Sequence, residues 1–287
     1  MLFTKPSDIE GWLANLQQLR STKTCANPSF IKPFHLAMLA HVLRTESVGH
    51  LTMPEKIGNY ADTMMLWEAL GIESPFPSKS RLAGGRYSPI ILLQDRSTID
   101  AVADKLVSLF SPVCADERTI DAVRTMLREL IDNCYSHSAV EGSLYGMICA
   151  QVWAGGRKAQ IVLSDSGVGI RASLLENELL HARLDAENSC TIATEFGVTG
   201  KPGRGHSGYG LSVARKLLEN NNGMLYVRSG NEAFSLLQNV AKSSYTELEW
   251  DGTLLVIEWD LDKQVDISDV YSTLPLPEGL DDDDFFA

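Results

Sequence analysis

A glycine-rich segment that runs directly into a helix is the feature of this 287-residue chain that most limits what it can fold into. The glycines are Gly203, Gly205, Gly208 and Gly210, and the helix is expected from about residue 210 to 220. Glycine lets backbone N–H groups approach an anion closely, and a helix N-terminus adds about half a positive charge there. A flexible linker is the alternative, but the position at a helix start favours a phosphate site.

Two common kinds of phosphate loop do not fit this segment. The chain has no GxxxxGK[ST] sequence, which excludes a P-loop nucleoside triphosphatase. The segment also does not join the first strand and helix of a dinucleotide-binding unit with an acidic residue about 20 residues later. A dinucleotide is therefore not the expected ligand.

A long helix expected from about Glu117 to His137 carries polar residues on one stripe. Glu129, Asn133 and His137 follow one another at intervals of four, so they share one face, while apolar residues between them point into the core. A carboxylate and an amide oxygen on one edge can hold a hard cation and orient a water molecule. A solvated polar face would show the same pattern, so the stripe alone does not decide between the two.

An apolar strand that ends at Asp165 is followed at once by Gly167 and Gly169. The two glycines let the backbone turn sharply against whatever the carboxylate binds. Turns of this kind also end many strands that have no binding role, so the motif is weak by itself.

The remaining pattern predicts an α/β protein with one sheet covered by helices. Strands are expected at 89–94, 144–153, 159–163, 224–229 and 253–259, and helices at 33–43, 61–70, 97–110, 117–137 and 210–220. A proline between two helical patterns, within residues 111–116, marks an expected boundary. It divides the chain into a small, regulatory or STAS-like α/β module at 1–112, a larger domain at 113–262 and an acidic tail at 263–287.

Taken in order, the three motifs resemble those of the GHKL ATPase superfamily, which includes gyrase, Hsp90, histidine kinases and MutL. The segment from Glu129 to His137 is similar to its N box, Asp165 to Ile170 to its G1 box, and Gly203 to Leu211 to its G2 box. Gly252-Thr253 and the apolar run after it resemble the closing strand of the same pocket. The resemblance covers about residues 115–260. It implies a two-layer α/β sandwich of the Bergerat type, with ATP between the sheet's helices and a mobile lid.

The resemblance also implies a role for each matching residue. Asp165 would accept a hydrogen bond from the adenine amino group, with Thr253 assisting through water. Asn133 would coordinate Mg²⁺, and Glu129 would be the general base for water or an acceptor hydroxyl. The lid would span about residues 172–204, with Lys201 and Arg204 as candidate γ-phosphate contacts. Further nucleotide contacts are implied for Gly167, Gly169, Ile170, Gly205, His206, Ser207, Gly208, Tyr209, Gly210 and Leu211.

Departures from the family pattern narrow the type of protein that the resemblance implies. Only about 30 residues follow the last expected strand, so the second domain of gyrase, Hsp90 and MutL is not expected. His35, His41 and His50 are followed by Leu, Val and Leu rather than by an acidic residue, so a phosphoacceptor histidine is not expected. The compact domain resembles more closely the anti-sigma-factor serine kinases of the superfamily. Residues 28–75 faintly resemble the STAS modules that such kinases regulate.

Three functions stay open on the sequence. A Mg²⁺-dependent ATP-binding signalling protein would phosphorylate a protein Ser or Thr hydroxyl, or hydrolyse ATP as a switch. A nucleotide-gated binding module would use ATP to order the lid for a partner, with little turnover. A homodimeric scaffold with a vestigial site is the third, and the complete set of motifs argues against it. A protein partner, either regulator or substrate, is expected for the first two.

Charge and apolar patterning exclude other classes of partner. The formal net charge is -12, and an acidic chain without a basic stripe repels nucleic acid. The chain has no run of 18 or more apolar residues and no signal-peptide pattern, so no membrane segment is expected. Five cysteines without a CxxC pair indicate a reducing compartment, so the protein is expected in the cytoplasm. The acidic tail, in which Phe285-Phe286 follows four aspartates, is expected to be solvated, with a docking peptide as the alternative.

Overall fold

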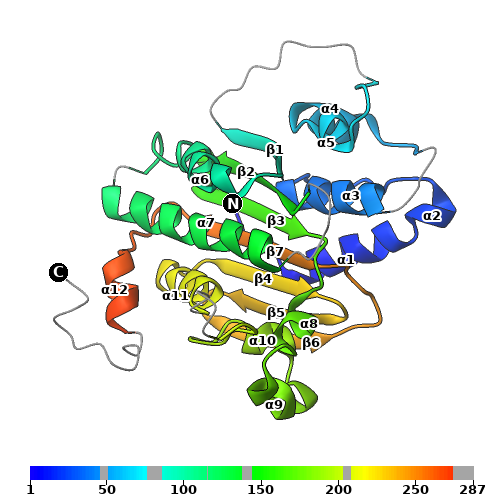
Figure 1. The fold of residues 1–287 in the computed structure, drawn as a ribbon. Coiled ribbons are helices and arrows are strands. Elements are labelled where there is room, and N and C mark those ends of the chain that lie inside the picture. The colour runs from blue at the N-terminus through cyan, green and yellow to red at the C-terminus, as the bar shows by residue number, and fades with distance from the viewer. Residues whose placement is uncertain (46–50, 76–85, 115, 138–143, 203–207, 274–287) are drawn as a thin grey trace.

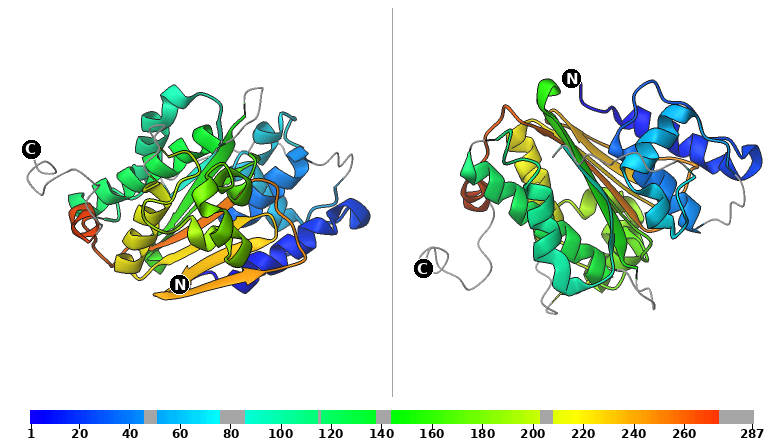
Figure 2. Two further views of the ribbon diagram at one scale, coloured as in Figure 1. Left: turned by 60° about the horizontal axis from the view of Figure 1, so that its bottom comes forward. Right: turned by 90° about the horizontal axis from the view of Figure 1, so that it is seen from above.

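The computed structural model describes residues 1–45, 51–75, 86–114, 116–137, 144–202 and 208–273. Seven strands form one sheet in the order β1-β2-β3-β7-β4-β5-β6, and every neighbouring pair is antiparallel. The strands are β1 (Tyr87–Leu93), β2 (Gly146–Trp153), β3 (Lys158–Asp165), β4 (Met224–Ser229), β5 (Glu232–Leu237), β6 (Val240–Tyr245) and β7 (Thr253–Asp260). Helices cover both faces of this sheet, so the described chain has three layers (Figures 1 and 2).

The front layer consists of helices that pack on one face of the sheet. They are α6 (Ile99–Val107), α7 (Glu117–His137), α11 (Gly210–Asn221) and α12 (Ile267–Ser272). Helix α7 forms where the apolar period predicted it, because Val123, Leu127, Ile131 and Cys134 all turn toward the sheet and are buried. The segment after β3 adds α8 (Ile170–Leu174), α9 (His181–Ala186) and α10 (Ser189–Ile192) at one end of the layer. Short 3₁₀ helices occur at Arg96–Thr98, Ala154–Gly156 and Glu178–Leu180.

The back layer is built by the N-terminal helices. They are α1 (Pro6–Gln17), α2 (Leu19–Thr22), α3 (Pro33–Thr45), α4 (Glu55–Thr63) and α5 (Leu66–Leu70). Their buried side chains form a second core with the back face of the sheet, to which Met147, Cys149, Val162 and Val256 contribute. The sheet therefore has an apolar core on each side, which explains why its central strands are almost continuously apolar.

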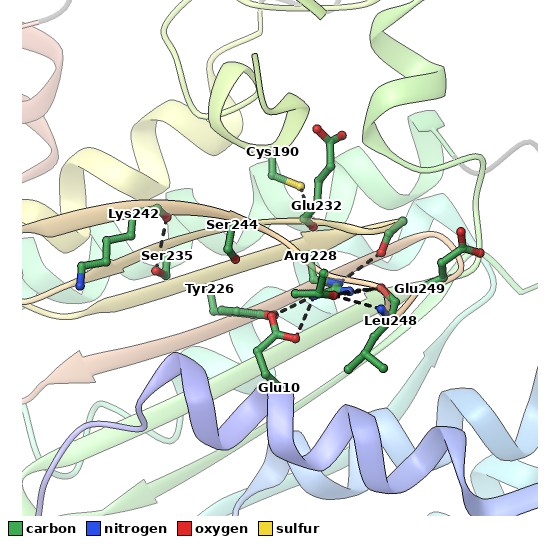
Figure 3. A network of polar contacts seen from close by, with 12 residues as sticks. Glu10, Cys190, Tyr226, Arg228, Glu232, Ser235, Lys242, Ser244, Leu248 and Glu249 are labelled. Atoms are coloured by element: carbon green, nitrogen blue, oxygen red, sulfur yellow. Dashed lines mark hydrogen bonds and ion pairs between the residues drawn. The ribbon is translucent and has the colours of Figure 1, made fainter. Parts of the chain in front are cut away.

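Buried polar networks fix the back layer to the sheet. Arg228 on β4 is fully buried and forms an ion pair with Glu10 on α1, at 2.9 Å, and Tyr226 donates to the same carboxylate (Figure 3). Lys32, just before α3, pairs with the buried Glu258 of β7 at 2.8 Å. Buried charges are tolerated only when paired in this way, so both networks specify how the helices dock.

The α/β class and the helix-covered sheet that the sequence predicts are confirmed, but residues 1–112 are arranged differently from the expected small module. Within the described residues, β1 pairs with β2 of the common sheet, α1 to α5 cover that sheet, and α6 packs on α7. Residues 28–75, compared above with STAS modules, contain helices α3, α4 and α5 and no strand in their described part. The N-terminal part is thus a helical layer and one edge strand of the same sheet.

Three other details differ from the expectation. The helix expected at 61–70 is broken at Met65, whose φ of 56° ends α4 and starts α5. The hairpin of β5 and β6 was not predicted. In the segment expected as an acidic tail, α12 packs against α7 and α11, with Val265 and Val270 buried.

Helices that could span a membrane are not found: in the described ranges, none is both long enough and apolar enough.

Candidate functional site

A pocket of about 260 Å³ lies between α7, α8, residues 193–200, the start of α11 and the ends of β3 and β7. All three sequence motifs contribute to it, although they lie far apart along the chain. The predicted site residues that line it are Glu129, Asn133, Asp165, Gly169, Ile170, Gly208, Tyr209, Gly210, Leu211 and Thr253. The fold therefore brings the three motifs to one site.

Asp165 and Thr253 form the end of this pocket at the sheet. The antiparallel register of β3 and β7 places them directly opposite each other. Gly167 donates its N–H to Asp165 Oδ1 at 2.9 Å, and both the hydroxyl and the N–H of Thr253 also bond to this carboxyl. Burial raises the pKa of Asp165 to about 6, against the lowering effect of these hydrogen bonds. The carboxylate is thus fixed and poorly solvated, which makes it a strong acceptor for a ligand N–H.

Glu129 and Asn133 on α7 face the first residue of α11. A Cβ atom on Gly210 would lie 2.9 Å from Asn133 Nδ2 and 3.2 Å from Glu129 Cβ. The lack of a side chain at Gly210 favours this approach, so the N-terminus of α11 contacts the polar stripe of α7. The partial positive charge at that helix end therefore lies beside a carboxylate and an amide, where an anion can be held.

Glu129 lines the pocket and stays partly accessible to solvent. Partial burial by the pocket wall raises its pKa, and the neighbouring Asp132 raises it further, while Arg128 acts in the opposite direction. A raised pKa makes a carboxylate a better proton acceptor near neutral pH. Its position and pKa suit Glu129 to general base chemistry.

The segment that the resemblance assigns to the lid touches the glycine-rich segment directly. Gly208 has a φ of 71°, and a Cβ atom there would lie 2.5 Å from the carbonyl oxygen of Val198. Next to it, the rings of Phe196 and Tyr209 stack with centroids 4.4 Å apart and planes 4° apart. The start of α11 and residues 193–200 are therefore in close contact.

Some predicted residues do not line the pocket in this structure. Lys201 donates from Nζ to the carbonyl oxygen of Ser136 at 3.0 Å and lies 3.9 Å from the Glu176 carboxylate. It therefore binds the C-terminal end of α7 rather than pointing into the pocket. Gly167 contributes through its hydrogen bond to Asp165. Arg204, Gly205, His206, Ser207 and the side chain of His137 lie outside the described residues.

Several lining residues were missed from the sequence, and two patterns would have indicated some of them. Asp132 follows Glu129 by three positions on α7, which places it on the same side of the helix. Leu163 lies two positions before Asp165 on β3, and Leu255 lies two positions after Thr253 on β7. Residues two apart on a strand point to the same face of the sheet. Residues three apart on a helix, or two apart on a strand, lie on the same side of the element. The spacing could therefore have added these neighbours to each motif. Ser173, Leu174, Ala193, Val198, Thr199 and Gly200 also line the pocket.

The donor set fits a magnesium nucleotide better than a metal held by protein alone. No group of three or more His, Cys, Asp or Glu that could hold a metal occurs in the described part of the chain. Mg²⁺ is commonly held by one or two protein oxygen ligands together with phosphates and waters. The Asn133 amide, beside a helix N-terminus suited to phosphates, meets that requirement.

Comparison with known proteins agrees with this geometry. Residues 119–261 match the family described as histidine kinase-, DNA gyrase B-, and HSP90-like ATPase. No curated protein and no solved structure matches the chain significantly. The matched range contains Glu129, Asn133, Asp165, Gly210 and Thr253. Residues 119–261 are therefore a GHKL-type ATP-binding domain, of the family of histidine kinase-, DNA gyrase B-, and HSP90-like ATPases.

Proposed function

We propose that this domain cleaves the γ-phosphate of ATP with Glu129 as general base and acts as a signalling protein. The acceptor is either a Ser or Thr hydroxyl of a protein partner, which makes the chain a kinase, or water, which makes it a switch. The observation that carries the proposal is the contact of Gly210 with Glu129 and Asn133. It aims the anion-binding end of α11 at a residue able to take a proton.

One end of the pocket binds the adenine base, and the other end binds the phosphates. Asp165, held by Gly167 and Thr253, accepts the amino group of adenine and sets the position of the base. Leu163 and Leu255 offer an apolar surface beside it. The N–H groups at the start of α11 receive the phosphates.

At the phosphate end, Glu129 takes the proton of the attacking hydroxyl, and Asn133 provides an oxygen ligand for Mg²⁺. The cation would neutralise phosphate charge when bound. The neighbouring Asp132 is already bonded to Arg96, at 2.9 Å, so it is less available as a base than Glu129.

The test follows the γ-phosphate of labelled ATP. Purified full chain and Mg²⁺ are incubated with and without extract of the source cells. Glu129→Gln removes the base with little change in shape, and Asp165→Asn removes the adenine acceptor. Glu117→Gln, at the exposed start of the same helix, is the matched control.

Each outcome assigns or rejects a role. Label on a protein band, kept in the control and lost in both site variants, identifies a kinase and the mass of its substrate. Label in free phosphate with the same dependence identifies an ATPase switch. Full turnover in Glu129→Gln would show that Glu129 is not the base.

A second candidate function is a nucleotide-gated binding module with little turnover. The stack of Phe196 on Tyr209 supports it, since a ligand at the start of α11 would act through this contact on the lid. Leu175 and Leu179, both within the lid range 172–204, are exposed apolar residues that an ordered lid would present to a partner. This function predicts that label stays on the nucleotide while ATP protects residues 175–200 from protease, and that Phe196→Ala loses the protection.

A further inference from the structure

Strand β6 forms an open edge of the sheet. It is the last strand in the order, opposite to β1, and among the described residues β5 is its only partner strand (Figure 1). All six of its residues are exposed, among them Val240 and Tyr245. An exposed edge strand offers backbone groups to another strand, and proteins commonly block or use such edges.

The hydrogen-bonding direction along β6 follows from its hairpin with β5. Thr246 donates its N–H to the carbonyl oxygen of Asn231 at 3.0 Å, and the register is regular along the whole hairpin. Hydrogen-bonded and non-hydrogen-bonded pairs alternate in an antiparallel ladder. The backbone N–H and C=O groups of Ser244, Lys242 and Val240 therefore point toward β5, as those of Thr246 do. The backbone N–H and C=O groups of the residues between them point outward: Ala241, Ser243 and Tyr245.

This edge is held rigidly at both ends. A two-residue turn, Gln238-Asn239, has φ values of 48° and 64°, the left-handed pair that tight hairpins require. At the other end, Arg228 donates to Thr246 Oγ1 at 2.7 Å. It also donates to the carbonyl of Leu248 (Figure 3). The strand is thus ordered before it meets a partner, which lowers the entropic cost of pairing.

We propose that β6 pairs with β6 of a second copy of this chain, antiparallel and centred on Ser243. The two seven-stranded sheets then become one continuous sheet across a two-fold axis. In this register Ser243 bonds with Ser243 of the second copy, and Ala241 bonds with Tyr245. Every outward backbone group of the strand receives a partner.

The side chains of β6 are self-complementary in that register. The large ring of Tyr245 lies over the small Ala241 of the second copy, and Ser243 meets its own small hydroxyl. Lys242 stands opposite Ser244 rather than opposite itself. In a chain of net charge -12, β6 carries no acidic residue, so two copies can approach here without carboxylates facing each other. These matches favour a second copy over an extended peptide from another protein.

The interface adjoins the lid. Asn188 donates from Nδ2 to the Ser244 carbonyl at 3.1 Å, while its Oδ1 accepts the Thr191 N–H at the start of α10. The dimer therefore fixes the strand to which Asn188 of the lid is bonded in each copy. This inference does not depend on whether water or a protein hydroxyl receives the γ-phosphate.

Sedimentation velocity of the full chain tests the proposal. The wild type is expected at twice the 31.5 kDa mass of one chain. Ser243→Pro removes one outward N–H without breaking a β5–β6 bond, so it is expected to sediment as a monomer that still binds ATP. Ser243→Ala keeps the N–H and is expected to remain a dimer. A monomeric wild type, or an undiminished dimer in Ser243→Pro, overturns the proposal.

A cross-link checks the register and does not depend on the proline variant folding. Directly opposite bonded residues have Cα atoms about 5.5 Å apart, within the range of a disulfide. Ser243→Cys is therefore expected to form a covalent dimer under mild oxidation, at least tenfold faster than Lys242→Cys, whose copies are offset along the strands. Equal or absent cross-linking at the two positions contradicts pairing centred on Ser243 and leaves a peptide from another protein as the occupant of the edge.

Discussion

Gly210 at the start of α11 stands so close to Asn133 on α7 that a Cβ atom would lie 2.9 Å from the amide nitrogen. The same atom would lie 3.3 Å from Glu129 Oε2. The two helices therefore approach each other closely at the pocket, where residue 210 has no side chain. This approach places the N–H groups at the start of α11 beside Glu129 and Asn133.

Gly210→Ala is accordingly expected to damage the site and the fold together. The added methyl group displaces the Asn133 amide and crowds Glu129 Cβ, from which it would lie 3.2 Å. Overpacking of this kind costs up to about 1–3 kcal/mol in the free energy of unfolding. Urea unfolding and ATP titration measure the two effects. Gly11→Ala on α1 is the control, because its Cβ meets nothing within 4 Å and alanine favours the helix by up to about 1 kcal/mol. Unchanged ATP affinity in Gly210→Ala would show that the contact is not needed for binding.

Asp165→Asn is expected to stabilise the protein without nucleotide while weakening ATP binding. The pKa of Asp165 rises from 3.8 to about 6 on folding, so the folded state binds more protons than the unfolded state between these values. The contribution of this group to the free energy of unfolding is therefore lost as pH rises through that range. At neutral pH the buried, ionised carboxylate destabilises the folded state, whereas a neutral asparagine does not. Thermal unfolding at pH 7.5 and at pH 4 measures the difference in stability between Asp165→Asn and the wild type, and this difference should be smaller at pH 4.

The same titration gives ATP binding a pH dependence. The carboxylate form accepts the adenine amino group, so affinity should fall as pH drops through about 6 in the wild type. Asp165→Asn should show weak binding without that step. A wild-type affinity that is flat across this range would contradict the role assigned to Asp165.

Much of the pocket could be predicted from the sequence because each of its parts is a local pattern. The apolar period gives α7 its bounds at Glu117–His137, and the apolar run after Gly223 gives β4 its bounds at Met224–Ser229. Asp165 and Gly169 are marked by a strand end followed by glycines, whereas Thr253 is implied by the resemblance to the closing strand of the family's pocket. What joins them, the opposition of Asp165 and Thr253, is a register between distant strands that no local pattern contains.

The docking of the N-terminal helices could not be read in the same way. Which sheet a helix covers depends on the matching of two surfaces, here α3 against Cys149 and Val162. A hint was present, since the continuous apolar runs of β2, β3 and β7 indicate burial on both faces. Strand β6, by contrast, has no buried face, so it lacks the alternation by which strands are recognised.

The Lys32–Glu258 pair predicts non-additive effects of substitution. Glu258 is fully buried, and its carboxylate also accepts hydrogen bonds from the N–H of Thr4 and from Gln160 Nε2. Lys32→Met leaves an unpaired buried carboxylate and is expected to cost about 3–5 kcal/mol of unfolding free energy. Lys32→Met with Glu258→Gln should recover at least half of that loss. Additive losses in the double variant would show that the ion pair does not link the back layer to β7.

Acid is expected to destabilise the protein through two buried histidines, His35 and His41 on α3. Burial lowers the pKa of each from 6.5 to about 4, so the unfolded chain takes up protons in this range and the folded chain does not. Stability should therefore fall as pH drops from about 6.5 to about 4, by about 3 kcal/mol for each histidine. His41→Phe keeps a ring on Trp250, against which His41 stacks at 4.3 Å, and should remove half of this slope. The exposed His181→Gln is the control, and an unchanged slope in His41→Phe would contradict the assignment.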